Sequence, residues 1–317
     1  MSKHARIALV LGDPAGVGAE IAAKLLQRLP RDEIEAITVI GDARQLDAGA
    51  RIAGVPRAEV AIEDRANADP REIALGRASV ESGRAALDNF VAALELARNG
   101  AVDAICFTPF NKQALRMAGN RHEDELRFAA EVLDWSGGVG EFNVLERLWN
   151  ARVTSHIPLS QVAAHLSAER IGAALDLTNR TMRQAGFERP RIAVAALNPH
   201  AGDGGAFGDE EIRIIAPAVA AARQRGIEAS GPYPADTVYV SARDGTFDAV
   251  LTMYHDQGQI AMKLLGFSRG VTLLGGLPFP VTTPAQGTAY DIAGRGTASA
   301  EALHQAYSLG QKLASVR

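Results

Sequence analysis

The chain alternates short apolar runs with long stretches rich in Ala, Leu, Arg and Glu, and this alternation most limits its fold. Short buried strands separated by amphipathic helices are typical of a largely parallel sheet that is covered by helices on both faces. We therefore expect an α/β chain. The strands are expected over residues 7–11, 36–40, 104–107, 152–155, 191–196 and 249–253, and the helices over 19–28, 80–98, 124–133, 160–185, 210–225 and 301–313.

Composition limits the kind of protein. At 317 residues and 47% apolar content, the chain is long enough for two domains and too apolar for wholesale disorder. A net charge of −4 argues against a broad nucleic-acid face, and the apolar runs are far below the ~20 residues of a membrane span. The single cysteine, Cys106, fits a reducing compartment. We expect a cytoplasmic protein that binds neither nucleic acid nor membrane.

Three histidines stand just beyond the carboxyl ends of predicted strands. His156 follows residues 152–155, His200 follows 191–196, and His255 follows 249–253. Ligands of open α/β sheets bind at these ends, and three imidazoles are able to hold one divalent metal with positions left open for substrate. The alternative is that each is an ordinary loop histidine.

Two glycine-rich segments are further candidates for ligand binding. Residues 286–296 combine small residues, which let a ligand approach the backbone, with Asp291, which would accept hydrogen bonds from a ribose. A tight turn before the last helix explains this segment equally well. Residues 12–18 form a strand-to-helix turn that matches neither G-x-G-x-x-G nor a P-loop, so they are a weak candidate for a phosphate loop.

Taken together, these segments resemble the 4-hydroxythreonine-4-phosphate dehydrogenase family, PdxA. The resemblance covers nearly the whole chain in order, and residues 287–296 are also similar to the NAD-binding loop of the isocitrate and isopropylmalate dehydrogenases. The segments that carry it are residues 12–18, 108–109 with Lys112, 156–159, 197–202, 231–237, 253–258 and 287–296.

The resemblance implies a fold and a division of the chain. It implies two α/β/α domains with largely parallel sheets, similar to isocitrate and isopropylmalate dehydrogenases, with the active site in the cleft between the domains. Residues 1–120 and 282–317 would form a discontinuous first domain. Residues 121–281 would form the second, with the metal ligands and the dimer interface.

The resemblance also assigns roles to residues. One divalent metal per subunit (Zn, Mg, Co or Mn) would be held by His156, His200 and His255. Asp236 would reach the partner's site in a homodimer, and Lys263 would bind substrate, although a solvent-facing helix lysine is the alternative. The cofactor would be NAD, or NADP, with NAD favoured by Asp291. The residues that match the cofactor loop are Gly287, Thr288, Ala289, Asp291, Ile292 and Gly294.

The family reaction oxidises a secondary alcohol β to a carboxylate of a small hydroxy acid, and the β-keto acid then loses carbon dioxide. A metal on neutral imidazoles suits this chemistry because it acts as a Lewis acid toward the hydroxyl and toward the enolate that forms on decarboxylation.

Several substrate positions differ from the family pattern. Counted from Lys112, the family's His-Thr pair falls on Glu125 and Leu126, and His122 would replace that histidine only if the loop is rearranged. Thr272 and Val281 stand at the positions of a phosphate-contacting Asn and Arg, and Gln286 stands where a His is usual. Losing the arginine removes a charge-assisted hydrogen bond of about 1.5–3 kcal/mol.

These departures favour a non-phosphorylated substrate such as a cis-dihydrodiol carboxylate, which would place the protein in aromatic catabolism. The terephthalate dihydrodiol dehydrogenase branch is similar to this chain at residues 263–265, Val281 and residues 291–294. An authentic 4-hydroxythreonine-4-phosphate dehydrogenase of pyridoxine biosynthesis and a sugar-acid 4-phosphate dehydrogenase are the alternatives within the family. Outside it, a zinc hydrolase with Asp256 or Asp236 as base and a non-catalytic binding protein remain open.

Overall fold

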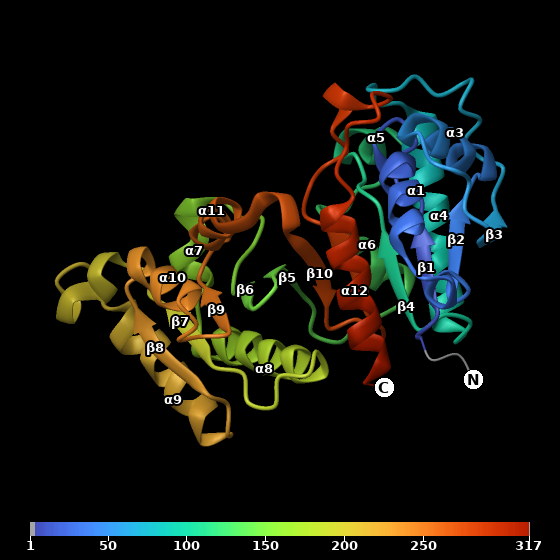
Figure 1. Ribbon diagram of the computed structural model, residues 1–317. Coiled ribbons are helices and arrows are strands. Elements are labelled where there is room, and N and C mark those ends of the chain that lie inside the picture. Colours follow the sequence, from blue (N-terminus) through green and yellow to red (C-terminus); the bar gives the residue numbers. More distant parts are fainter. Residues whose placement is uncertain (1–3, 317) are drawn as a thin grey trace. The chain divides into compact units, whose positions relative to one another are not determined.

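A computed structural model describes residues 4–316. The chain divides into two compact units, each described by itself (Figure 1). Unit 1 comprises the residues up to Ser136, Ser268–Leu273 and those from Leu277 onward; unit 2 comprises Gly137–Phe267 and Leu274–Gly276. The division expected from the sequence is also discontinuous, but its boundaries fall at other residues: it joins 1–120 with 282–317 and keeps 121–281 separate. It stays a prediction about domains.

Unit 1 is built on strands in the order β3-β2-β1-β4-β11-β10. The first five strands run parallel, and β10 is antiparallel to β11. Its strands are β1 (Ile7–Val10), β2 (Ile37–Gly41), β3 (Ala61–Asp64), β4 (Ala104–Phe107), β10 (Val271–Gly275) and β11 (Val281–Pro284). Its helices are α1 (Gly18–Arg28), α2 (Arg31–Ile34), α3 (Ala43–Ala53), α4 (Val80–Arg98), α5 (Lys112–Met117), α6 (Glu125–Val132) and α12 (Glu301–Ser315).

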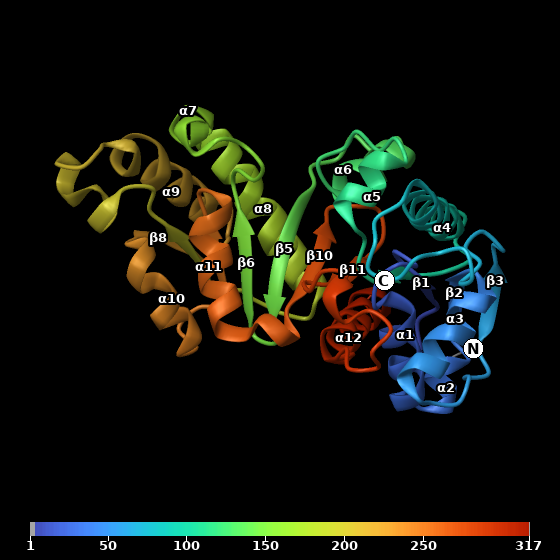
Figure 2. The ribbon, with the colours of Figure 1, turned by 90° about the horizontal axis from the view of Figure 1, so that it is seen from above.

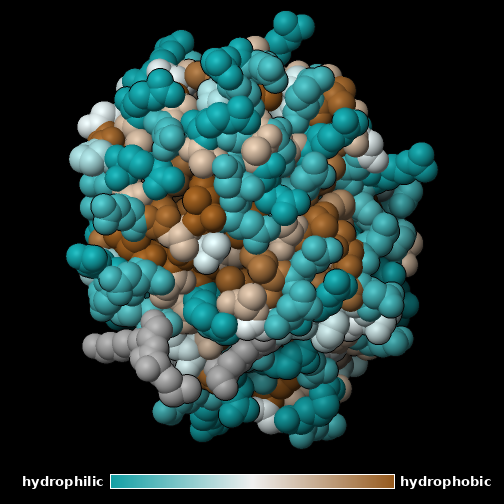
Figure 3. All heavy atoms as spheres, turned by 90° about the vertical axis from the view of Figure 1, so that its right-hand side faces the viewer, coloured by the Kyte–Doolittle hydropathy of each residue, from teal (hydrophilic) through white to brown (hydrophobic). Residues whose placement is uncertain are grey.

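Helices cover both faces of the unit 1 strands. Figure 2 shows α4, α5 and α6 on one side and α1, α3 and α12 on the other. Strands β1 and β4 are fully buried between these layers, as their apolar sequences require. The edge strand β3 ends on Glu63 and Asp64, whose charges discourage pairing with another strand. Seen from that edge, hydrophilic side chains dominate the outline and apolar ones gather in the middle (Figure 3).

Unit 2 is built on strands in the order β5-β6-β9-β7-β8. Strands β6, β9, β7 and β8 run parallel, and β5 is antiparallel to β6. The strands are β5 (Gly140–Leu145), β6 (Leu148–Arg152), β7 (Ile192–Ala195), β8 (Ala229–Tyr233) and β9 (Ala249–Thr252). The helices are η1 (Leu159–Gln161), α7 (Val162–His165), α8 (Ala168–Gln184), η2 (Pro199–Gly205), η3 (Glu211–Ile215), α9 (Ala216–Gln224), α10 (Ala235–Arg243) and α11 (His255–Gly266). The short helix η4 (Phe267–Arg269) stands where the chain passes from unit 2 to unit 1.

The helices of unit 2 also lie in two layers. Helices α10 and α11 contact β9, and α8 packs with α9 and β6. The core under α10 and α11 is apolar and closely packed; its buried members are Leu148, Ala193, Ala195, Val238, Tyr239, Ala242, Val250 and Met262. Two layers of helices around largely parallel strands confirm the expected α/β class.

The two units fasten the amino ends of neighbouring parallel strands in the same way. Arg6 precedes β1, and its backbone N–H and Nη2 donate to the carboxylate of Asp103, before β4, at 2.8 and 2.7 Å. Arg191 precedes β7 and donates to Asp248, before β9, at the same two distances. A bidentate arginine fixes both the position and the orientation of the carboxylate. Each pair therefore fixes how the first residues of two neighbouring strands lie relative to each other.

Three predicted elements need correction. The strand expected over 152–155 ends at Arg152. The helix expected over 160–185 is broken, because the Ser167 side chain accepts a hydrogen bond from the Arg170 N–H and starts α8 afresh. The helix expected over 210–225 begins as a π-helix before Pro217, which has no N–H for the carbonyl four residues earlier. Among residues 4–316, no helix has the length and apolarity needed to cross a membrane.

Candidate functional site

Unit 2 carries the three predicted histidines on three adjacent strands. Strands β6, β9 and β7 lie side by side and run parallel. His156 follows β6, His255 opens α11 just after β9, and His200 lies in η2 after β7. Because parallel neighbours end at one edge of a sheet, the three imidazoles emerge at the same edge.

Two of these imidazoles are neighbours, with their ring planes tilted by 42°. The ring centres of His156 and His255 are 5.6 Å apart. Nδ1 of His255 lies 2.7 Å from a carboxylate oxygen of Asp256, which is the kind of partner that fixes the orientation of a metal-binding histidine and leaves its Nε2 for the ligand. The His200 ring centre lies 6.2 Å from that of Phe207.

The backbone around His200 is unusual. His200, Ala201 and Asp203 have φ values of 55°, 55° and 45°, in a run that continues through two glycines. Left-handed backbone costs roughly 1–2 kcal/mol per residue outside glycine, so it persists only where the surroundings fix it. Sequence periodicity gives no sign of this conformation.

A buried carboxylate fixes this loop. Glu211 is 3% exposed, and its Oε1 accepts hydrogen bonds from the backbone N–H groups of Leu197 and Asn198, both at 2.8 Å. Its Oε2 accepts from the Asn198 side-chain amide at 3.0 Å. Burial alone would raise the pKa of Glu211, but the hydrogen bonds from Asn198 and Leu197 outweigh it and hold the pKa below its usual value. A Cβ at Gly202 would lie 2.7 Å from Oε2 and 2.8 Å from the Gly208 carbonyl oxygen, and φ there is +80°, so the position requires glycine.

The structure does not bring the ligand atoms of all three histidines within 4.8 Å of one another, but the chemistry of this donor set suits a divalent metal. Imidazole nitrogens are ligands for zinc and for other first-row divalent ions, and the second nitrogen of His255 already has a carboxylate partner. His156 and His200 are exposed and His255 is half-buried, so all three side chains are open to solvent.

Two further predicted residues lie in the same unit. Lys263 is on α11, eight residues beyond His255, and its side chain is exposed. Asp236 stands in the first turn of α10, after β8, and is exposed as well.

In unit 1, the predicted cofactor loop rests on the strand-to-helix turn at residues 12–18. The Val17 N–H donates to the Thr288 carbonyl at 3.0 Å, and the Tyr290 hydroxyl donates to Oδ2 of Asp13 at 2.5 Å. A Cβ at Gly16 would lie 2.8 Å from that Thr288 carbonyl, so the glycine permits the contact. The turn therefore supports the loop, which is a role that its sequence did not indicate.

The loop itself offers backbone and one carboxylate to a ligand. Space around Gly287 is open, since a Cβ there would meet nothing within 4 Å. Asp291 and Gly294 are exposed, Ala289 and Ile292 are half-buried, and Thr288 is buried. An open glycine and an exposed carboxylate on one loop fit the phosphate and ribose of a dinucleotide.

The predicted substrate residues of unit 1 differ in exposure. Leu126 in α6 is 3% exposed, and Val281 on β11 is fully buried beside Ile105 of β4. Glu125 and Thr272 are half-buried. His122 has its ring centre 5.8 Å from that of Phe128 and its Nε2 3.3 Å from Glu131.

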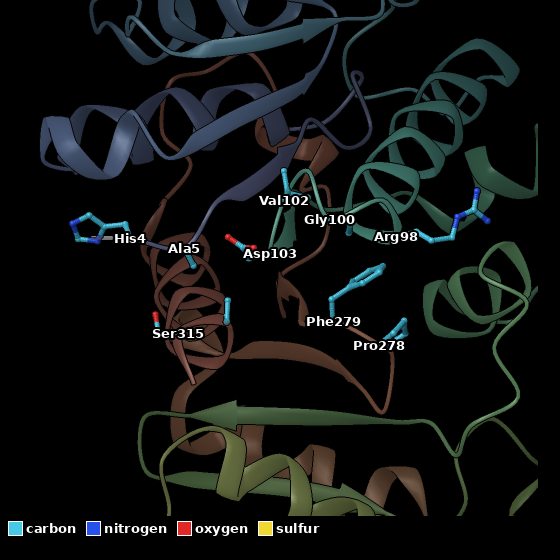
Figure 4. A pocket seen from close by; sticks show the side chains of 11 residues that line it. His4, Ala5, Arg98, Gly100, Val102, Asp103, Pro278, Phe279 and Ser315 are labelled. Carbon is cyan, nitrogen blue, oxygen red and sulfur yellow. The ribbon is translucent and has the colours of Figure 1, made fainter. Parts of the chain in front are cut away.

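A hollow of about 610 Å³ lies at the opposite, amino end of the unit 1 strands (Figure 4). It is lined by residues that precede β1, β4 and β11, among them Ala5, Val102 and Phe279. The one carboxylate among the lining residues, Asp103, already accepts hydrogen bonds from the Arg6 guanidinium. This hollow lies at the end of the sheet that α/β proteins do not use for chemistry, so we assign it no function.

Comparison with known proteins identifies the family. The sequence pattern described as "Pyridoxal phosphate biosynthetic protein PdxA" matches residues 22–310. The chain belongs to the PdxA family. It is 53% identical to a Rhizobium meliloti (strain 1021) protein named "Putative 4-hydroxythreonine-4-phosphate dehydrogenase 2", over 97% of this chain and 93% of the relative. It is 36% identical to D-threonate 4-phosphate dehydrogenase of Salmonella typhimurium (strain LT2), over 97% and 98%.

Solved structures agree with this PdxA-family membership. A 4-hydroxythreonine-4-phosphate dehydrogenase from Klebsiella pneumoniae superposes with a TM-score of 0.85 at 38% identity, covering 99% of each chain. A terephthalate 1,2-cis-dihydrodiol dehydrogenase from Burkholderia xenovorans LB400 superposes with a TM-score of 0.68 at 27% identity, covering 97% of this chain and 98% of the other. A β-decarboxylating dehydrogenase from Thermococcus kodakarensis gives 0.50 at 13% identity, over 95% and 80%, and bears out the expected likeness of fold.

Proposed function

We propose that this PdxA-family chain is a metal- and NAD-dependent dehydrogenase that oxidises a secondary alcohol β to a carboxylate and releases carbon dioxide. The observation that carries the proposal is the placement of His156, His200 and His255 after three adjacent parallel strands, with two of the rings 5.6 Å apart. The relatives carry the names of dehydrogenases, which supports oxidation of an alcohol as the class of reaction.

Each group of the chain has a distinct part in this reaction. The three histidines would hold the divalent metal as neutral ligands, and the metal, when bound, lowers the pKa of the substrate hydroxyl and stabilises the enolate of decarboxylation. Asp256 would keep the His255 ring oriented. Lys263, exposed on the same helix as His255, would bind the substrate carboxylate by its charge.

The loop at residues 287–294 would bind NAD. Its glycines leave the backbone open to the pyrophosphate, and Asp291 would accept hydrogen bonds from the ribose hydroxyls. A carboxylate at that point repels the 2′-phosphate of NADP, so we favour NAD.

For the substrate we propose a four-carbon hydroxy acid 4-phosphate, either 4-hydroxythreonine-4-phosphate or D-threonate 4-phosphate. The names of the relatives at 53% and 36% identity support this class. The sequence expectation of a non-phosphorylated dihydrodiol has weaker support, from a structure 27% identical to this chain. It stays as the second candidate because Val281, an uncharged and fully buried residue, stands where the family carries arginine.

We also propose that the active form is a homodimer in which Asp236 reaches the partner's site. Asp236 is exposed, and several large apolar side chains of unit 2 are exposed too, which suits an interface. These are Leu159, Phe207, Ile212, Val240, Ile260, Leu264 and Leu265. Sedimentation of wild type and of Leu264→Glu would test this: a wild-type dimer that becomes a monomer supports the proposal, and a wild-type monomer refutes it.

The deciding experiment is NADH formation by the metal-loaded protein with each of three substrates: 4-hydroxythreonine-4-phosphate, D-threonate 4-phosphate and a cis-dihydrodiol carboxylate. Turnover of a phosphorylated acid is the expected result. Turnover of the dihydrodiol alone would show that the second candidate, a non-phosphorylated dihydrodiol carboxylate, is the substrate. His156→Ala should abolish turnover, while His165→Ala, the same change on α7, should not. No NADH from any of the three would overturn the proposal in favour of a hydrolase or a binding protein.

A further inference from the structure

The backbone N–H and C=O groups of Met253 lie between the three histidine-bearing loops. Met253 directly follows β9 and precedes His255 by two residues. Its carbonyl accepts a hydrogen bond from Oγ1 of Thr154 at 2.7 Å and another from the Thr154 backbone N–H at 3.1 Å. Thr154 follows β6 and precedes His156 by two residues, so these bonds tie the loop of His156 to that of His255.

The backbone N–H of the same residue is tied to the third loop. The Met253 N–H donates to Oε1 of Gln257 at 2.7 Å, and Nε2 of Gln257 donates to the Ala196 carbonyl at 2.7 Å. Ala196 directly follows β7 and starts the segment that leads to His200. Gln257 thus uses both ends of its amide to join the loops of His255 and His200.

The neighbours leave these two side chains little freedom. Thr154 is 5% exposed. The first turn of α11, which carries Gln257, packs directly on β6: a Cβ at Gly258 would lie 2.3 Å from the amide oxygen of Asn150. That oxygen accepts a hydrogen bond from the Tyr239 hydroxyl at 2.5 Å. The start of α11 is therefore held against the strand before His156.

We propose that Thr154 and Gln257 are positioning residues that hold the three histidine loops in register before the metal binds. The proposal rests on the proposed three-histidine metal site. Parallel strands end in separate loops, and without links between them each histidine would have to be ordered at the moment of binding. Fixed loops remove that entropic cost, and residues behind metal ligands typically change metal affinity by about 10- to 100-fold.

The test measures metal binding by the unliganded protein. Thr154→Val removes one hydroxyl at nearly constant shape, and Gln257→Met removes both amide bonds at nearly constant length. Thr178→Val is the matched control, because Thr178 lies in the same unit, is fully buried, and donates its hydroxyl to the Ala174 carbonyl within α8. Zn²⁺ affinity would be measured by competition with a chromophoric chelator, and ligand geometry by the visible absorption of bound Co²⁺.

We expect Thr154→Val and Gln257→Met each to lower the Zn²⁺ affinity by about 10-fold or more and to shift the absorption spectrum of bound Co²⁺. Thr178→Val should match wild type in affinity and in spectrum. Circular dichroism should show all four proteins folded, and Thr154→Val carries the test if Gln257→Met is unfolded. Affinity and spectra equal to wild type in Thr154→Val would overturn the inference while leaving the metal site intact. Wild-type protein that binds neither ion would overturn the proposed function, and the inference with it.

Discussion

The hydroxyl of Tyr290 donates a hydrogen bond of 2.5 Å to the carboxylate of Asp13. Asp13 is 1% exposed and lies just after β1, whereas Tyr290 belongs to the candidate cofactor loop near the end of the chain. Burial raises the pKa of Asp13 even though the Tyr290 hydrogen bond favours its charged form. This pair joins the turn at residues 12–18, which matches no standard phosphate-binding motif, with the loop proposed to bind NAD.

Tyr290→Phe should therefore weaken NAD binding. The change leaves the ring in its apolar surroundings but removes one hydrogen-bond partner of a buried carboxylate, whose other oxygen keeps the Ala15 N–H; such a loss costs about 1–3 kcal/mol. We expect the KM for NAD to rise by about 10-fold, with the Zn²⁺ affinity unchanged, because the proposed metal ligands lie in unit 2. Steady-state kinetics with NAD as the varied substrate measures this.

Tyr307→Phe provides the matched control. Tyr307 lies on α12 of the same unit, and its hydroxyl accepts a hydrogen bond from Gln311 at 3.0 Å. This variant should keep the wild-type KM for NAD even if its melting temperature falls. An unchanged KM in Tyr290→Phe would show that Asp13 and Tyr290 do not set the conformation of the loop.

Glu211→Ala should loosen the loop that carries His200. The change removes the acceptor of three hydrogen bonds, from Leu197 and Asn198. Hydrogen bonds to a charged group contribute about 1.5–3 kcal/mol each, and the losses are not additive, so we expect a free energy of unfolding lower by about 3 kcal/mol. Chemical denaturation measures it, and Zn²⁺ affinity should fall as well.

Glu210→Ala is the comparison for this change, since Glu210 accepts a single hydrogen bond from the Asn198 side chain at 2.7 Å. Its effect on unfolding and on Zn²⁺ affinity should be clearly smaller. Equal effects of the two substitutions would contradict the assignment of the anchoring role to Glu211.

The two arginine–aspartate pairs should contribute to acid unfolding. The hydrogen bond from Arg6 lowers the pKa of Asp103. Burial alone would raise the pKa of Asp248, but the hydrogen bonds from Arg191 outweigh it and lower that pKa too. A carboxyl whose folded-state pKa is depressed stabilises the protein above its unfolded pKa of about 3.9, and this stability is lost as the pH falls through the folded value.

Asp103→Asn and Asp248→Asn should each make the melting temperature less dependent on pH on the acid side, below about pH 5, and lower it near neutrality. The arginines are about half exposed, so the effect of each pair is modest. Melting curves of the two variants and wild type across that range measure it, and parallel acid limbs in all three proteins would refute the prediction.

Cys106 should be unreactive in the folded protein. It lies in β4 with no exposed surface, and burial raises its pKa to about 12. Since the thiolate is the reactive form, a thiol reagent at pH 8 should modify Cys106 only after unfolding. Modification of the native protein at the rate seen in denaturant would contradict this, and otherwise the reaction reports on opening of the unit 1 core.

The local sequence pattern predicts the bounds of elements that are long or uniformly apolar. Strand β4 and helix α4 have the bounds that the sequence predicts, because a continuous apolar run and a long helical stretch with the Ser79 cap leave few alternatives. Strands β3, β5, β8, β10 and β11 went unpredicted. They are polar, contain glycine or proline, or lie at an edge, and pairing with neighbours rather than their own residues makes them strands.

Local patterns were enough to predict the α/β class and the position of His156, His200 and His255 after strands, and motifs in order along the chain were enough to predict the family. Local patterns did not predict that β6, β9 and β7 are neighbours, or that Gln257, Glu211 and the Asp13–Tyr290 pair tie distant loops together. Hydrogen bonds between residues far apart in the chain depend on strand order and register. Those arise from the packing of the whole sheet, which no local propensity encodes.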